Sequence, residues 1–204
     1  MNNNELYATP KADLIDSEND NTQRFFPASR KKLVIMYFAT LGLYKIYWFY
    51  KHWDLQKSQK SLAGDDMIPL LRALFYVFFT HSLFKRIEDA AEIKNISKSW
   101  SAGPLATLFV ILTLVSNFLD RISMRSDVYS MTDYIVFLLL LVLLFPIYAV
   151  QGTANQINND AEEKLNSEFS IYNIIFILIG LVFWFLILVA ALDVDVSFLA
   201  EYLN

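Results

Sequence analysis

The sequence predicts an all-α, polytopic helical membrane protein, and two observations support this. Of the 204 residues, 55% are hydrophobic and only 19% are charged, whereas a typical soluble domain is about 45–50% apolar and about 25% charged. The apolar residues also form long unbroken runs, and the run from Phe137 to Phe145 lacks the apolar–polar alternation of a barrel strand. Together with the absence of cysteine, this excludes a disulfide scaffold and argues against a water-soluble enzyme.

Four regions follow from the composition along the chain. Residues 1–23 are polar, have no apolar period and are predicted to be a disordered tail. Residues 24–99 form an aromatic and basic membrane hairpin, residues 100–192 a transmembrane bundle, and residues 193–204 an acidic tail. The first 32 residues contain no continuous apolar core of the kind a signal peptide needs.

Five apolar segments are expected, two of them in the hairpin region. Ser29 is a candidate N-cap before the first segment, 33–53. Lys32 and Lys51 would be about 28 Å apart on one helix, close to the thickness of the hydrocarbon core. The second segment, 67–84, is interrupted by Arg72 and His81. These two segments either span the membrane or lie in its interface.

The other three segments are predicted to span the membrane. They contain no charged residue and cover residues 103–119, 134–150 and 169–192. Pro146 is expected to kink the last turn of the middle one.

Two topologies agree with the preference of Lys and Arg for the inner side. With five spans and an inner N-terminus, ten basic residues lie inside and five outside. If segments 33–53 and 67–84 instead re-enter the same leaflet, three spans remain and the division becomes fifteen against two. Both topologies place the N-terminus in the cytoplasm and the C-terminus outside.

Two cations inside the hairpin segments are candidates for contact with an anion or lipid headgroup. Lys45 lies six residues before Lys51, and Arg72 lies six residues after Asp66, so a hairpin of the two segments would place both at one depth. His81 would add a titratable group. Alternatively, each long side chain extends separately to the nearest headgroups.

The aromatic residues at the end of the first segment are interpreted as anchors at the membrane interface. They are Tyr44, Tyr47, Trp48, Tyr50 and Trp53. Nucleic-acid stacking platforms also need a basic groove, and the net charge of this chain is −4. No nucleic-acid partner is therefore expected.

Three amides follow the fourth segment at helical spacing. Gln151, Asn155 and Asn158 fall at i, i+4 and i+7 and therefore share one helical face. They are interpreted either as a polar seam to another helix, in this chain or in a partner, or as a solvated helix end.

No catalytic or metal-binding motif appears in the sequence. The only histidines are His52 and His81, and nucleotide-binding, hydrolase and zinc-protease motifs are all missing. No enzymatic activity, no metal and no cofactor are expected.

Residues 25–53, with FFPAS followed by TLGLYKIYWFYKHW, resemble a family of uncharacterised bacterial membrane proteins. The family pattern is F-x-P-x-S and then T-x-G-x-Y-x-x-Y-W-x-Y-K. The similarity continues to the amides at 151, 155 and 158. It implies a bacterial inner-membrane location and brings no activity or site residue.

The sequence favours two functional hypotheses. The first is a scaffolding or interaction component of a membrane assembly, which binds a protein partner or a second copy through its basic inner face and the amide seam. The alternative is a small transporter or lipid-handling protein that contacts an anionic headgroup through Lys45 and Arg72. Membrane lipids are partners in both.

Overall fold

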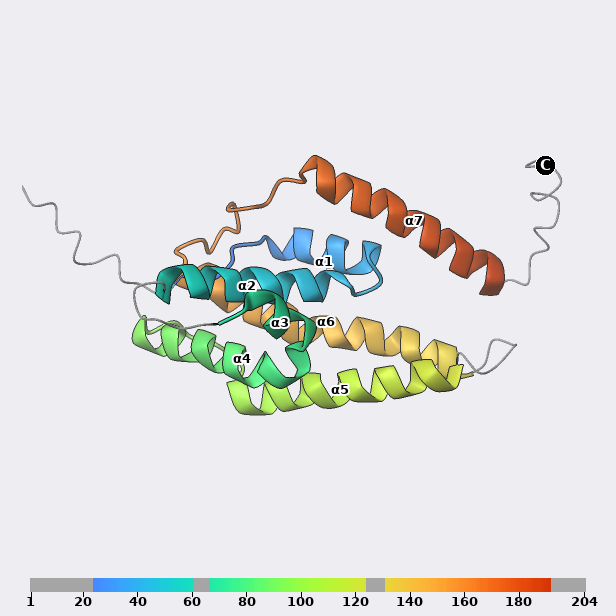
Figure 1. Ribbon diagram of the computed structural model, residues 1–204. Coiled ribbons are helices and arrows are strands. Elements are labelled where there is room, and N and C mark those ends of the chain that lie inside the picture. The colour runs from blue at the N-terminus through green and yellow to red at the C-terminus, as the bar shows by residue number, and fades with distance from the viewer. Residues whose placement is uncertain (1–23, 61–66, 124–130, 192–204) are drawn as a thin grey trace, which may run out of the picture.

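The computed structural model of the protein describes residues 24–60, 67–123 and 131–191, and every regular element in these ranges is a helix (Figure 1). This confirms the predicted all-α class. The expected tails, 1–23 and 193–204, lie outside the described residues.

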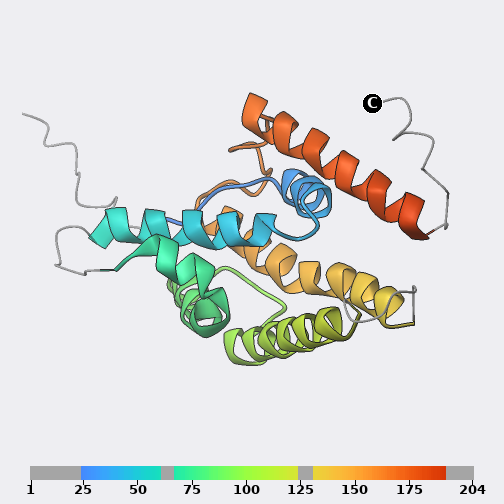
Figure 2. The ribbon, with the colours of Figure 1, turned by 45° about the vertical axis from the view of Figure 1, so that its right-hand side comes forward.

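Three helices are long and apolar enough to cross a membrane. They are α5 (Ala102–Ser123), α6 (Met131–Ile157) and α7 (Ile171–Ala191), and they correspond to the three segments predicted as spans. Helix α6 continues through Pro146 and is about 40 Å long on the α-helical rise. In both views α5 and α7 lie on opposite sides of the bundle (Figures 1 and 2). Five spans are not confirmed.

Segment 33–53 does not form one long helix but folds by itself as a hairpin of two helices, and from here on 'the hairpin' means these two helices. Helix α1 (Arg30–Ala39) begins at Ser29, whose hydroxyl accepts a hydrogen bond from the Lys32 amide. The chain turns at residues 40–43, and the Thr40 hydroxyl accepts a hydrogen bond from the first amide of α2 (Tyr44–Lys60). Gly42 has φ 80°, and a Cβ there would lie 2.8 Å from the Leu140 side chain. Glycine thus provides both the turn and the space.

The two ends of this hairpin meet. The Arg24 amide donates to Gln59 Oε1 at 2.8 Å, and the Gln56 amide nitrogen donates to the Arg24 carbonyl at 2.8 Å. At the start of α1 the Arg30 guanidinium lies against Gly152, whereas the hairpin tip lies against Leu140. These two positions on α6 are twelve residues, or about 18 Å, apart. The hairpin therefore runs along part of α6 and returns to its starting end.

Segment 67–84 does not form one span either. Helix α3 (Pro69–Leu74) is six residues long, and Phe75 separates it from α4 (Tyr76–Ile93). Helix α4 continues past Phe84 as an amphipathic helix that buries Leu83, Phe84 and Ile87. Lys85 and Arg86, which directly follow the predicted segment 67–84, lie inside this helix.

Glu88 on α4 fixes the start of α5. Its carboxylate accepts hydrogen bonds from the Ala102 amide at 3.1 Å and from Lys98 Nζ at 2.8 Å. Burial alone would raise the pKa of Glu88, but the bonds from Lys98 and Ala102 lower it below its usual value. Glu88 therefore remains an anion at the N-terminus of α5, where an anion is favourable.

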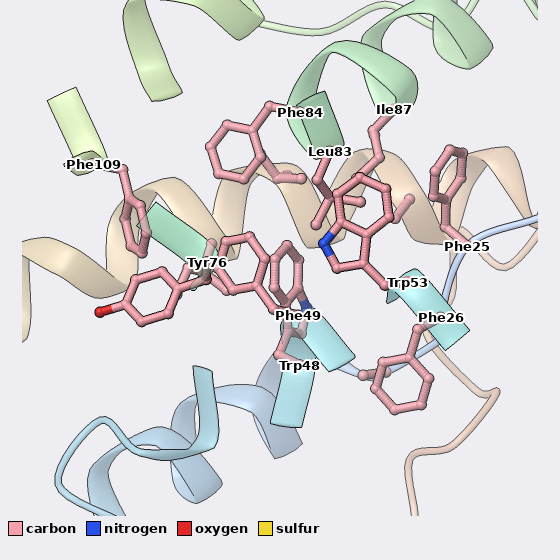
Figure 3. Packing of buried hydrophobic residues seen from close by; sticks show 14 of the residues in the cluster. Phe25, Phe26, Trp48, Phe49, Trp53, Tyr76, Leu83, Phe84, Ile87 and Phe109 are labelled. Atoms are coloured by element: carbon pink, nitrogen blue, oxygen red, sulfur yellow. The ribbon is translucent and has the colours of Figure 1, made fainter. Parts of the chain in front are cut away.

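Aromatic side chains from α2 form the centre of the core with residues of α3, α4 and α5 (Figure 3). Trp48 and Trp53 are 0% exposed and Tyr44 is 5% exposed. These three side chains, predicted as anchors at the membrane interface, are packed inside the protein, because α2 is covered by α3, α4 and the segment before α1. Tyr47 is 46% exposed and Tyr50 is half-buried, so these two remain accessible at the surface.

Candidate functional site

The three amides of α6 hold the extended segment that precedes α1. Asn158 Nδ2 donates to the Phe25 carbonyl at 2.7 Å, and its Oδ1 accepts from the Phe25 amide at 3.0 Å. Asn155 pairs in the same way with both backbone groups of Ala28, at 2.9 and 3.4 Å. Each asparagine thus replaces the partner that a neighbouring β-strand would supply.

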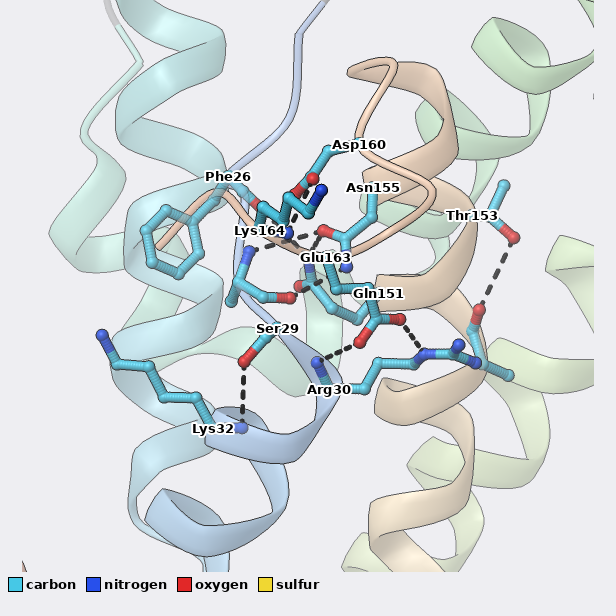
Figure 4. Close-up of polar contacts among 12 residues, drawn as sticks. Phe26, Ser29, Arg30, Lys32, Gln151, Thr153, Asn155, Asp160, Glu163 and Lys164 are labelled. Carbon is cyan, nitrogen blue, oxygen red and sulfur yellow. Dashed lines mark hydrogen bonds and ion pairs between the residues drawn. The ribbon is translucent and has the colours of Figure 1, made fainter. Parts of the chain in front are cut away.

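Gln151 connects this segment to α2. Figure 4 shows Gln151 and Asn155 among the polar contacts between α6 and the start of α1. Its Nε2 donates to the Phe26 carbonyl at 3.0 Å and to Asn155 Oδ1 at 2.7 Å. Its Oε1 accepts from the Trp48 indole at 2.5 Å, and His52 Nε2 lies 3.4 Å away. Complete burial lowers the pKa of His52 to about 3, so its ring is neutral at physiological pH.

The amide seam is therefore closed inside the chain. It joins α6 to residues 25–28 and to α2 rather than to another helix of a partner. Gln151 and Asn155 are fully buried. The three amides share one face, as their spacing predicts; Gln151 contacts helix α2 of the same chain, whereas Asn155 and Asn158 bind the non-helical segment before α1.

The loop after α6 is attached to the start of α1 by charged groups. Glu163 accepts hydrogen bonds from the Arg30 amide at 2.8 Å and from the Arg30 guanidinium. Lys32 Nζ donates to Asn166 Oδ1 at 2.7 Å and to the Glu168 carbonyl at 2.6 Å. This attachment, which no residue pattern predicts, fixes the end of the hairpin at which α1 begins.

The structure does not bring Lys45 and Arg72 together. Lys45 Nζ lies 5.5 Å from the centre of the Tyr76 ring, whereas the Arg72 guanidinium lies 4.5 Å from the Trp53 ring. Trp53 is eight residues, or about 12 Å, further along α2. The expected basic pair is absent because segment 67–84 breaks at Phe75 and α3 packs near the far end of α2.

His81 lies apart from both cations. It is exposed on α4, and its Nε2 lies 3.0 Å from the Thr107 hydroxyl of α5. His81 therefore links α4 to α5 and takes part in neither the Lys45–Tyr76 contact nor the Arg72–Trp53 contact.

Lys45 instead faces a cavity of about 470 Å³, which we name the tip cavity. It lies between the hairpin tip and the three long helices. Its polar lining comprises Lys45, Thr113, Ser116, Asn117, Asp120, Ser123 and Asp133. Its apolar lining comprises Leu41, Val136, Phe137, Leu140, Leu143, Trp184 and Ile187.

Opposite charges face each other in the tip cavity. Lys45 and Asp120 both line the cavity and are close enough to interact electrostatically, but the ion pairs and hydrogen bonds of the described residues include none between these two side chains. Asp133 accepts a hydrogen bond from the Ser123 hydroxyl. The Thr113 hydroxyl is buried near Tyr76, but it makes no hydrogen bond of normal geometry within the described residues. The cavity therefore contains polar groups with unused bonding capacity.

One sequence signal could have revealed this cavity. Thr113, Asn117 and Asp120 recur at i, i+4 and i+7, the same spacing as the amide triad, and mark a polar face on an otherwise apolar helix. Asp120 directly follows the predicted span 103–119. Within the described residues, no group of three or more histidine, aspartate or glutamate side chains could hold a metal ion.

The chain matches no protein-family model, no curated protein and no solved structure.

Proposed function

We propose that this chain is a non-enzymatic membrane protein that holds a polar ligand in the tip cavity, as a small transporter or a lipid-handling protein. The observation that carries the proposal is the position of Lys45 and Asp120 across a cavity bounded by three long apolar helices, without a direct ion pair. Charged groups at membrane depth are costly, and they occur mainly where they pair, face water or contact a substrate.

The hairpin tip supports the same proposal. Residues 40–43 are non-helical and lie against Leu140, nine residues from the start of α6. Non-helical backbone at membrane depth is tolerated where protein surrounds it or where it lines a water-filled cavity. Leu41 in this turn is part of the cavity wall. A re-entrant hairpin that ends at a hydrated cavity satisfies both conditions.

The interaction hypothesis is less well supported. It relied on the amides of α6, and the bonding capacity of Gln151 and Asn155 is used within the chain. Helix α7 packs mainly on α1, touches α6 where the Trp184 and Phe137 rings meet, and exposes an apolar surface that lipid can cover.

We also propose a three-span arrangement with the N-terminus in the cytoplasm and the C-terminus outside. With Lys45 left at membrane depth, the division of fourteen basic residues inside against two outside supports it. On this orientation the tip cavity faces the outer leaflet, because its polar residues Asp120, Ser123 and Asp133 lie at the ends of α5 and α6 that face away from the start of the hairpin. A bacterial inner membrane is the location that the resemblance implies.

Cysteine labelling tests whether the tip cavity is hydrated. Ser116 lines the cavity, whereas Leu114 and Phe118 on the same helix are exposed on the apolar outer surface. The native chain has no cysteine, so Ser116→Cys, Leu114→Cys and Phe118→Cys give a matched series. In proteoliposomes, a membrane-impermeant maleimide should modify the Ser116→Cys protein at least tenfold faster than the two controls. Equal, slow modification of all three would refute a hydrated ligand site.

A further inference from the structure

We infer that the ligand of the tip cavity is a zwitterionic phosphoethanolamine headgroup of a phospholipid, with its phosphate at Lys45 and its primary ammonium at Asp120. This inference rests on the proposed function. It goes further by assigning the charge pattern and the source of the ligand.

The first argument is the separation of the two charges. Elsewhere in the described chain, lysines near carboxylates form direct pairs, as in Lys98–Glu88 at 2.8 Å and Lys85–Asp89 at 2.8 Å. Lys45 and Asp120 face each other without such a pair. An anionic ligand would satisfy Lys45 but be repelled by Asp120, and a cationic ligand would do the opposite. A ligand with both charges satisfies both residues.

The second argument is the order of the charges in depth. Asp120 lies three residues from Ser123, where α5 ends. Lys45 lies over the Tyr76 ring, which lies near Thr113 and packs 6.0 Å from the ring of Phe109, residues about 15 and 21 Å before the same end of α5 on the helical rise. The cation is therefore deeper than the carboxylate. In a phospholipid of that leaflet the phosphate is joined to the glycerol and the ammonium is the terminal group, so the ammonium can reach Asp120 while the phosphate stays at the deeper Lys45.

The third argument is the composition of the walls. Ser116 and Asn117 supply hydrogen-bonding groups near Asp120. Phe137 and Trp184 contact each other edge to face, with ring centres 5.9 Å apart, and form an apolar wall between α6 and α7. A headgroup attached to acyl chains uses both surfaces, whereas a free amino acid or phosphoethanolamine leaves the apolar wall without a partner.

The test measures lipid bound to the purified full chain by native mass spectrometry after exchange into detergent. Three lipids with identical acyl chains are offered: phosphatidylethanolamine, phosphatidylcholine and phosphatidylglycerol. We expect phosphatidylethanolamine to be retained at least tenfold better than the other two. Phosphatidylcholine lacks ammonium N–H donors, and phosphatidylglycerol lacks the positive charge.

Charge variants distinguish the ligand classes. Lys45→Gln and Asp120→Asn should each reduce phosphatidylethanolamine binding at least tenfold, whereas Lys45→Arg should restore it. Arg72→Gln is the matched control, because Arg72 lies over Trp53 and not in the cavity; its binding should equal that of the parent. Thermal unfolding of each variant in the same detergent shows whether it is folded.

Several outcomes would overturn the inference without affecting the proposed function. Retention of phosphatidylglycerol that only Lys45→Gln removes would identify an anion site. Binding that only Asp120→Asn removes would identify a cation site. Equal displacement of the lipid by soluble phosphoethanolamine at similar concentration would make the free zwitterion the ligand. If the parent chain retains none of these ligands while Ser116→Cys is still labelled, the cavity is hydrated and serves another solute.

Discussion

Replacement of Asn155 by leucine tests whether α6 holds the N-terminal segment through side-chain amides. Asn155 is 1% exposed and supplies both hydrogen-bond partners of the Ala28 backbone. Leucine has a similar shape, so packing changes little, but two buried backbone groups lose their partners. Each unsatisfied buried group costs about 1–3 kcal/mol, and since the bond from the Ala28 amide is long, we expect a total loss of about 2–4 kcal/mol in the free energy of unfolding.

Two further variants provide the internal comparison. Gln156 is the next residue on α6, but its side chain is exposed, so Gln156→Leu should change stability by no more than about 0.5 kcal/mol. Asn158 is only partly buried, and water can replace its bonds, so Asn158→Leu should cost about 1 kcal/mol or less. Reversible unfolding in mixed micelles measures all three. A cost for Asn155→Leu no larger than that for Gln156→Leu would refute the reasoning.

Two other predictions concern His52 and the contact between α1 and α7. Because the folded-state pKa of His52, about 3, lies below its ordinary value of 6.5, the unfolded chain binds the extra proton as the pH falls. Stability should therefore drop by about 2 kcal/mol between pH 7.5 and 5.0, and His52→Phe should remove that part of the slope in unfolding curves. A Cβ on Gly180 would overlap the Ala39 carbonyl oxygen, so Gly180→Val should lower the thermal midpoint, whereas Gly103→Ala, with open space around it, should not.

The three long apolar helices could be predicted because a bilayer imposes a simple requirement on the residues that cross it. Twenty or so consecutive apolar residues are needed to cross it, and segments 103–119, 134–150 and 169–192 meet or approach that length. The hairpin was harder to recognise, because its turn is marked in the sequence only by Gly42. The distribution of basic residues favoured the topology with the re-entrant hairpin. This distribution depends on the side of the membrane on which each loop lies and not on the hydrophobicity of the segments.

The candidate site was predicted only in part, because residue types do not reveal their neighbours. Helical spacing placed Gln151, Asn155 and Asn158 on one face, but it could not show that the Phe25 and Ala28 backbones fill that face. Tryptophan suits both a membrane interface and a buried core, so Trp48 was misassigned. Lys45 was selected as a candidate anion contact together with Arg72, but the structure places it near Asp120 and not near Arg72.

The most direct test of the account is the side of the membrane on which residue 58 lies. Ser58 and Ser167 are both exposed, and Met131 is exposed at the other end of α6. Single cysteines at these three positions, in the naturally cysteine-free chain, can be labelled from each side of sealed vesicles. The re-entrant hairpin predicts that Ser58→Cys and Ser167→Cys react from the same side and Met131→Cys from the other. Reaction of Ser58→Cys from the side of Met131→Cys would show that segment 33–53 crosses the membrane and would contradict the account.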